Sequence, residues 1–398
     1  MTTNTVKNKK YIVKYKAITI YKRENVMKRI YNYLKKDAVL TISWVLAIIS
    51  MLFIKPDKAY AGYIDWRSLG ILWSLMIITK GYMQNGIFEK IGHALLARTR
   101  KMWQLIAVLV GLNFFSSMII TNDVSLITFV PFAIMMLKQC GRQELMIPVV
   151  VLQTIAANLG SMLTPIGNPQ NLYLYGLAGT GIGEFIMWLL PYTIASALLL
   201  VISILLIKNK NEIICIEDTD SEAAHNISVP RVMAYSVLFI LALLVVARVL
   251  TWYILAAAVL ITVLLLEKNV LAKADYALLL TFIGFFIFTG NMGRVESVAH
   301  FLAGIVNGRE LEAGIITSQC ISNVPAALLL SEFTDNIKNL AIGVNIGGLG
   351  TLIASMASLI SYKLYANEVP EKKGKYFAAF TVYNIIFLVV LYVFTKLI

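Results

Sequence analysis

Apolar residues occur in long runs that cover most of this chain. A helix needs about 20 mostly apolar residues to cross about 30 Å of hydrocarbon. Nine runs approach that length, at residues 38–54, 69–85, 145–165, 185–207, 232–248, 250–266, 275–291, 340–362 and 376–396. The pattern predicts an all-α integral membrane protein with about nine spanning helices.

Two further apolar stretches, 102–137 and 311–331, are interrupted near the middle by polar residues. The interruptions are Thr121-Asn122-Asp123 and Ser322-Asn323. An unpaired Asp at mid-membrane costs at least about 2.5–3.5 kcal/mol, and irregular backbone survives there only inside protein or beside a water-filled cavity. We therefore expect two re-entrant hairpins, each made of two half-helices that meet at a polar tip.

The two halves of the chain share three matches in the same order. Residues 86–93 match 293–300, Asn122 matches Asn323, and residues 158–168 match 345–355. The one span between the copies, 232–248, turns the second copy upside down. Inverted repeats with broken helices are the architecture of secondary transporters, whose sites lie near the membrane midplane. We divide the chain into a basic cytoplasmic N-terminal segment (1–37), a first repeat (38–207), a cytoplasmic connector with a linking span (208–249) and a second, inverted repeat (250–398).

Composition agrees with a lipid environment. Of the 398 residues 59% are hydrophobic and 14% charged, too few charges to cover the surface of a soluble fold of this size. The net charge of +13 is concentrated between Lys7 and Lys36, with eleven Lys or Arg and one acid, Glu24. We interpret this run as a cytoplasmic flank that contacts the lipid bilayer rather than as a nucleic-acid arm, and Met27 within it as a second candidate start.

Basic residues set the expected orientation of a multi-pass protein of the cytoplasmic membrane. Those that flank the first hairpin place both of its ends in the cytoplasm, together with the N-terminus. The Gly-rich turn at 176–183 falls outside. In the second copy, the basic residues at 268, 273, 363, 372, 373 and 375 agree with inversion, whereas Arg294 and Arg309 are exceptions.

Enzyme chemistry finds no support in the motifs. Three scattered cysteines form no CxxC pair and three histidines are too few for a metal cluster, so we expect no metal cofactor. HExxH, GxSxG and Walker A motifs are absent from the sequence. We expect a protein that is not an enzyme and that uses no cofactor beyond a coupling Na⁺ or H⁺.

The segment Thr164-Pro165-Ile-Gly167-Asn168-Pro169-Gln-Asn171 lies inside an otherwise spanning run. Its prolines and glycine free backbone groups at depth. A bound cation satisfies freed carbonyls, and half-helix N-termini favour an anion. A simple Pro-kinked helix is the alternative, but two prolines, a glycine and two asparagines within eight residues favour a binding site.

The hairpin tips offer hydroxyl and amide groups suited to a dehydrated ion. The alternative is that these residues only cap half-helices. Asp123 could hold Na⁺, exchange a proton or balance a nearby cation. In the second copy Thr351 and Ser355 stand opposite Thr164 and Asn168 without the prolines and Asn side chains, so the ion site there is expected to be weaker or absent. Lys80 is interpreted as a snorkelling residue outside the site.

These motifs together resemble the ion transporter superfamily, which includes arsenite-efflux pumps, citrate carriers, sodium/proton antiporters and divalent-anion/sodium symporters. The resemblance implies that Asn122 and Asn323 are the central ligands, that Gly167 and Asn168 form the broken-helix side, and that Na⁺ would lie near Asn122, Asp123, Gly167 and Asn168. Relatives of this fold often dimerise. Asp123 and Val324 stand where the symporter branch has Thr, so the tips are more similar to the arsenite and citrate side.

The sequence leaves three functions open. The favoured one is a secondary active transporter that moves a small inorganic or organic anion by alternating access, driven by Na⁺ or H⁺. The second is a Na⁺/H⁺ antiporter of the same fold in which Asp123 alternates between the two cations. The third, a membrane-embedded enzyme or structural subunit, has no supporting motif.

Overall fold

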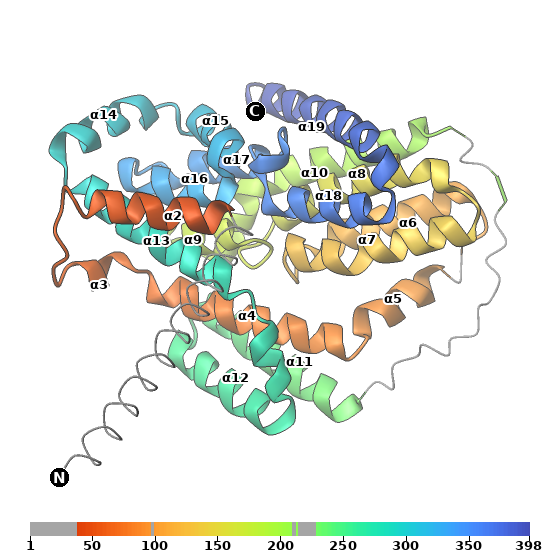
Figure 1. Ribbon diagram of the computed structural model, residues 1–398, viewed down its shortest axis with the longest axis horizontal. Coiled ribbons are helices and arrows are strands. Elements are labelled where there is room, and N and C mark those ends of the chain that lie inside the picture. Colours follow the sequence, from red (N-terminus) through yellow and green to blue (C-terminus); the bar gives the residue numbers. More distant parts are fainter. Residues whose placement is uncertain (1–37, 97–98, 209–211, 214–227) are drawn as a thin grey trace, which may run out of the picture.

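The computed structural model describes residues 38–96, 99–208, 212–213 and 228–398. The predicted N-terminal segment 1–37 and most of the connector before residue 228 lie outside this part of the chain. Within it the regular structure is helical, apart from one isolated bridge between Lys101 and Ile213 (Figure 1). The expected all-α class is confirmed.

The helices follow the predicted apolar runs closely. The first half contains α2 (Ala38–Ser50), α3 (Tyr60–Tyr63), α4 (Trp66–Gln84), α5 (Ile87–Leu96), α6 (Met102–Ser116), α7 (Asn122–Gln139), α8 (Met146–Ser161), α9 (Pro169–Ala178) and α10 (Ile182–Leu206). The second half contains α11 (Val229–Val246), α12 (Trp252–Leu266), α13 (Tyr276–Gly293), α14 (Glu296–Val306), α15 (Glu310–Ile321), α16 (Asn323–Leu330), α17 (Ile337–Ile346), α18 (Met356–Glu368) and α19 (Lys373–Thr395).

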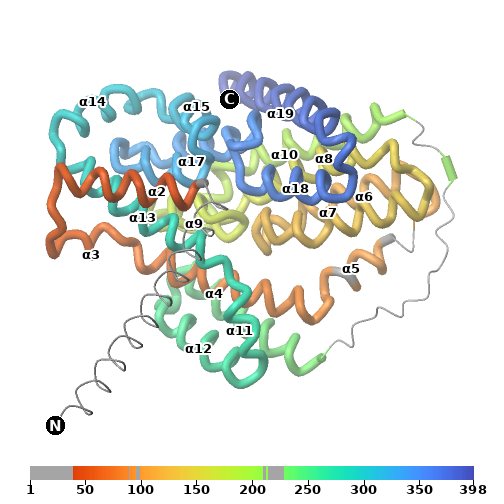
Figure 2. Tube along the Cα trace, viewed as in Figure 1, coloured from red at the N-terminus to blue at the C-terminus, as the bar shows by residue number. Residues whose placement is uncertain are grey.

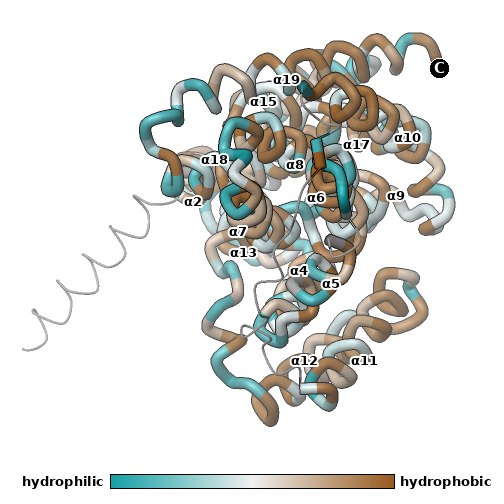
Figure 3. The backbone as a smooth tube through the Cα atoms, turned by 90° about the vertical axis from the view of Figure 1, so that its right-hand side faces the viewer, coloured by the Kyte–Doolittle hydropathy of each residue, from teal (hydrophilic) through white to brown (hydrophobic). Residues whose placement is uncertain are grey.

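Several helices can cross a membrane. Among the described residues, five stretches are long and apolar enough by length and composition: Gln143–Ser161, Ile182–Leu206, Val229–Val246, Tyr276–Gly293 and Pro370–Thr395. Shorter apolar helices accompany them, so the total of nine spans stays a prediction. Large apolar side chains are exposed along α10, α11, α12 and α19, as lipid-facing helices require. Figure 3 shows that hydrophobic residues predominate along these helices. The chain is a multi-pass membrane protein.

Both predicted interruptions are present. The first apolar stretch breaks between α6 and α7, and the second breaks between α15 and α16 at the single residue Ser322. In each case the tip residue stands immediately before a new helix that begins with an asparagine, Asn122 or Asn323.

The run at 340–362, expected to be one spanning helix, is also broken. α17 ends at Ile346 and α18 begins only at Met356. This segment has none of the prolines that separate α8 from α9. Glycines take their role: Gly350 has φ +102, a conformation that residues with a Cβ rarely adopt.

The helices pack in a crossed arrangement. α2 packs against α13 and α12 packs against α4, so the first long helix of each predicted repeat lies on the second long helix of the other (Figure 2). α6, α7 and α8 form one packed group, and α15, α16 and α17 form another. α18 lies on α7, and α9 lies on α16 and α17, which brings both broken helices to the hairpins.

Candidate functional site

The two hairpin tips have the same unusual backbone. Thr121 has φ 60° and ψ 147°, and Ser322 has φ 76° and ψ 154°. Non-glycine residues in such regions are strained by about 1–3 kcal/mol each, and this strain persists only where the surroundings impose it. The Asn122 and Asn323 side chains that follow are buried. The equal strain at two matched positions makes the tips the first candidates for a functional site.

Replacing Ser322 by glycine should therefore stabilise the protein by about 1 kcal/mol, because glycine adopts φ 76° without a Cβ clash. Thermal unfolding of the purified protein measures the change. Ser322→Ala is the matched control, since it removes the same hydroxyl and keeps the strain. Equal stabilisation by alanine would show that the hydroxyl, and not the backbone, is responsible.

A first buried polar cluster joins the first hairpin to the second broken helix. Nδ2 of Asn122 donates to Oδ1 of Asn158 on α8 (3.1 Å), which also accepts the hydroxyl of Ser355 (3.0 Å). Nδ2 of Asn158 donates to Oγ of Ser358 on α18 (3.2 Å). All four side chains are at most 5% exposed. A membrane interior offers such groups no water, so they must be satisfied by one another or by a ligand.

A second cluster is built the same way around Asn345 on α17. Its Oδ1 accepts Nδ2 of Asn168 (3.0 Å), and its Nδ2 donates to Oδ1 of Asn171 (2.6 Å). Asn168 also caps α9 by accepting the amide of Asn171 (2.9 Å), and Pro169 is the first residue of that helix. Capping and clustering therefore occur together, and the capping alternative does not compete with a site.

The two clusters correspond to each other under the predicted repeat. Asn158 matches Asn345. Asn158 contacts Ser355 and Ser358, which lie ten and thirteen residues after Asn345. Asn345 contacts Asn168 and Asn171, which lie ten and thirteen residues after Asn158. The threonines repeat this relation. Thr164 Oγ1 donates to the carbonyl of Met118 (2.5 Å), and Thr351 Oγ1 donates to the carbonyl of Gln319 (3.2 Å). Both carbonyls lie four residues before a tip asparagine.

Close backbone contacts connect the clusters to the tips. The amide of Asn122 donates to the carbonyl of Gly167 (3.1 Å), next to Asn168. On the other side, Nδ2 of Asn323 lies 2.9 Å from where a Cβ on Gly348 would be. A series of neighbouring residues thus runs from Asn122 through Asn168 and Asn345 to Asn323, and it links both tips with both broken helices.

Not every predicted residue lies at the centre. Thr351 is exposed and its contacts go to Gln319 on the second hairpin. Pro165 interrupts the chain between α8 and α9. The remaining predicted residues lie at the tips, at the breaks or in the clusters: Thr121, Asn122, Asp123, Thr164, Gly167, Asn168, Pro169, Asn171, Ser322, Asn323 and Ser355.

The structure adds residues that sequence reasoning left out of the site. Asn158, Asn345 and Ser358 make the central contacts, and their matched positions in the repeat were the signal that could have identified them. Lys80 on α4 is half-buried, and its charge interacts with those of Asp123 and Asp275. The interpretation of Lys80 as a snorkelling residue stays a prediction: its Nζ contacts Sδ of Met83 (3.9 Å), and within the described residues it forms no ion pair with Asp123.

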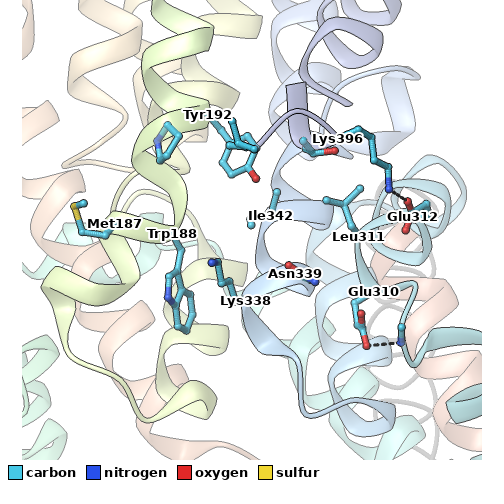
Figure 4. Close-up of a pocket in the computed structure, with 14 residues that line it drawn as sticks. Met187, Trp188, Tyr192, Glu310, Leu311, Glu312, Lys338, Asn339, Ile342 and Lys396 are labelled. Carbon is cyan, nitrogen blue, oxygen red and sulfur yellow. Dashed lines mark hydrogen bonds and ion pairs between the residues drawn. The ribbon is translucent and has the colours of Figure 1, made fainter. Parts of the chain in front are cut away.

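A polar cavity of about 360 Å³ lies elsewhere, between α10, α15, α17 and α19 (Figure 4). Trp188 and Tyr192 point into it from α10. Its acids have partners: Glu312 pairs with Lys396 (2.5 Å), and Glu310 accepts the amide of Gly308 (2.8 Å). None of the predicted site residues lines this cavity, so it is separate from the tips.

Comparison with known proteins points to transport. Residues 33–339 match the family model of the citrate transporters. An uncharacterized transporter of Methanocaldococcus jannaschii is 32% identical over 90% of this chain and 97% of its own length. The inner membrane protein YbiR of Escherichia coli is 29% identical over 81% of this chain and 87% of its own length. A silicon efflux transporter of Oryza sativa subsp. japonica is 30% identical over 37% of this chain and 30% of its own length.

The resemblance to the ion transporter superfamily is thereby confirmed. An all-helical membrane fold with broken helices and a family match over most of the chain lead to one conclusion. This protein is a membrane transporter that belongs to the citrate transporter family.

Proposed function

We propose that the protein is a secondary active transporter that moves a small anion, coupled to Na⁺ or H⁺, through a site between two inverted copies, residues 38–207 and 250–398. The observation that carries the proposal is the pair of corresponding asparagine clusters, each of which joins one copy to the other. Rocking of one copy against the other would open this region to each side in turn.

The chemistry of the region suits two ions of opposite sign. α7, α9, α16 and α18 all begin there, and helix N-termini favour anions. The breaks around Gly167 and Gly348 free carbonyl oxygens, which favour a cation. We place Na⁺ beside Asn122, Asp123, Gly167 and Asn168, and the anion between the tips. Citrate and silicate are substrates to test first, because the family and one relative are named for them.

Uptake into proteoliposomes tests the proposal. The purified full chain is reconstituted, a Na⁺ gradient or a proton gradient is imposed separately, and the flux of citrate, silicate and arsenite is measured. We expect one gradient to drive flux of one solute, and Asn122→Ala to remove it. Absence of gradient-dependent flux with folded protein would contradict the proposal.

A Na⁺/H⁺ antiporter is the second candidate, favoured by Asp123, the one acid of the two tip motifs, on which the charge of Lys80 acts. In that case Asp123 exchanges the two cations and Lys80 balances its charge when no Na⁺ is bound. Asp123→Asn should then abolish Na⁺-dependent proton movement, which a pH-sensitive dye inside the vesicles reports.

The matched control is Asp335→Asn, an exposed acid between α16 and α17, outside both tips and both asparagine clusters. If Asp123→Asn changes only the choice or affinity of the anion, the antiporter is excluded and the anion transporter is supported. If it changes neither proton movement nor anion flux, Asp123 has no part in coupling.

A further inference from the structure

A separate group of polar side chains lies away from the hairpin tips and from both asparagine clusters, where three turns of the chain meet. These are the start of α4, the end of α9 and the turn between α11 and α12. Each contributes a group with a strong donor: Arg67 and Ser68 from the first, Thr180 beside the second, and Arg248 from the third. The basic residues of the sequence place all three turns on the external face.

Arg248 is fixed in place by the end of α9. Its Nη1 donates to the carbonyl of Gly179 (2.8 Å) and its Nη2 to the carbonyl of Tyr175 (3.1 Å). The guanidinium lies over the Tyr175 ring, 5.1 Å from the centroid. Carbonyls and an aromatic face orient this cation without neutralising its charge.

Arg67, in the first turn of α4, lies beside the same turn of α9. Its Nη1 lies 3.2 Å from where a Cβ on Gly176 would be, so glycine leaves room for the guanidinium. Its Nη2 is buried and has no hydrogen-bond partner. The charge of Arg248 acts against that of Arg67, and the charge of Asp65 offsets part of this repulsion.

Two hydroxyls at this turn are also unsatisfied. Ser68 is 3% exposed, its Oγ has no partner, and it lies 3.5 Å from the same point beside Gly176. Thr180 Oγ1, next to the carbonyl that holds Arg248, is buried without a partner as well. Buried donors are nearly always satisfied in folded proteins, so three together indicate a missing acceptor.

Asp65 is the acid at this turn; its Oδ2 lies 3.9 Å from the same point beside Gly176, but it forms no ion pair with Arg67. Its Oδ1 accepts the amide of Ser68 (3.0 Å) as the N-cap of α4. Within the described part of the chain no ion pair joins a carboxylate to Arg67 or to Arg248.

We propose that Arg67, Arg248, Ser68 and Thr180 form an external binding site for an oxyanion, a phosphate or carboxylate group. Such a group accepts several hydrogen bonds at once, pairs with guanidinium forks and removes the repulsion between the two cations. A soluble oxyanion captured from outside and the phosphate of an anionic lipid share this chemistry. The site does not depend on the proposed transport function, because its evidence lies outside the tips.

Thermal unfolding of the delipidated full chain in detergent tests the site. Sodium phosphate or sulfate should raise the Tm above that in sodium chloride of equal ionic strength, because a ligand that prefers the folded protein stabilises it. A parallel titration uses short-chain phosphatidylglycerol, and native mass spectrometry detects lipid retained during purification. A rise with the soluble ions assigns a free oxyanion, and a rise with the lipid alone assigns a headgroup.

Arg67→Gln should abolish the rise in Tm with either probe. Without a probe its Tm should stay close to that of the wild type, because the loss of the attraction to Asp65 is offset by the loss of the repulsion from Arg248. Arg294→Gln is the matched control: it removes one positive charge from the same predicted face, where Arg294 pairs with Asp57 (2.8 Å), and should keep the response.

Three results would overturn the proposal. One is that neither probe stabilises the wild type more than chloride does. Another is that Arg67→Gln responds as the wild type does. The third is that Arg67→Gln alone lowers the Tm strongly, because Arg67 would then be a structural residue with a partner in the fold.

Discussion

Replacing Asn345 by alanine is expected to lower the free energy of unfolding by about 2–4 kcal/mol and to abolish gradient-driven transport. Asn345 is 2% exposed and joins α17 to the start of α9 through Asn168 and Asn171. Its removal leaves Oδ1 of Asn171 buried without a donor and takes one of two acceptors from Nδ2 of Asn168. Urea unfolding and proteoliposome uptake measure the two effects.

Asn339→Ala is the matched control for this prediction. Asn339 lies on the same helix, is half-buried, and lines the separate cavity of Figure 4. Its replacement should change the unfolding free energy by less than about 0.5–1 kcal/mol. Equal effects of the two substitutions would mean that the cluster around Asn345 has no special part in holding the repeats together.

The second large effect is expected for Gly167→Ala. A Cβ at this position would lie 2.1 Å from the carbonyl oxygen of Ser161, a backbone atom that cannot rotate away. Overpacking of this kind destabilises by about 1–3 kcal/mol or more. The shift would also displace the carbonyl that accepts the amide of Asn122, so transport should be lost even where the protein remains folded.

Gly183→Ala provides the comparison for that substitution. Gly183 lies in the first turn of α10 with open space around it, and alanine there should stabilise the helix by about 0.5–1 kcal/mol. Thermal unfolding and uptake are measured for both variants. If Gly167→Ala is as well tolerated as Gly183→Ala, the break between α8 and α9 can move, and it does not hold the first hairpin tip.

The apolar runs of the sequence predicted where the helices lie to within a few residues, because in a lipid environment the spanning helices are the hydrophobic segments. The tips at Asn122 and Asn323 were predicted because polar residues deep in the membrane are costly unless they have a partner or a ligand. The break between α17 and α18 was not expected as a gap of nine residues, because its glycines are also common inside membrane helices.

The sequence by itself determined the membrane environment, the hairpin tips, the matched positions of two repeats and the residue types available to a site. It left open which of those polar groups meet. Only the tertiary structure brought Asn158 to Ser355 and Ser358, and Asn345 to Asn168 and Asn171. The physical reason is that hydropathy records how each segment meets lipid, whereas contacts between distant segments depend on how helices cross and pack. These crossings depend on close backbone contacts at small residues, such as Gly160 against the carbonyl of Phe114. A single sequence does not show which glycine makes such a contact.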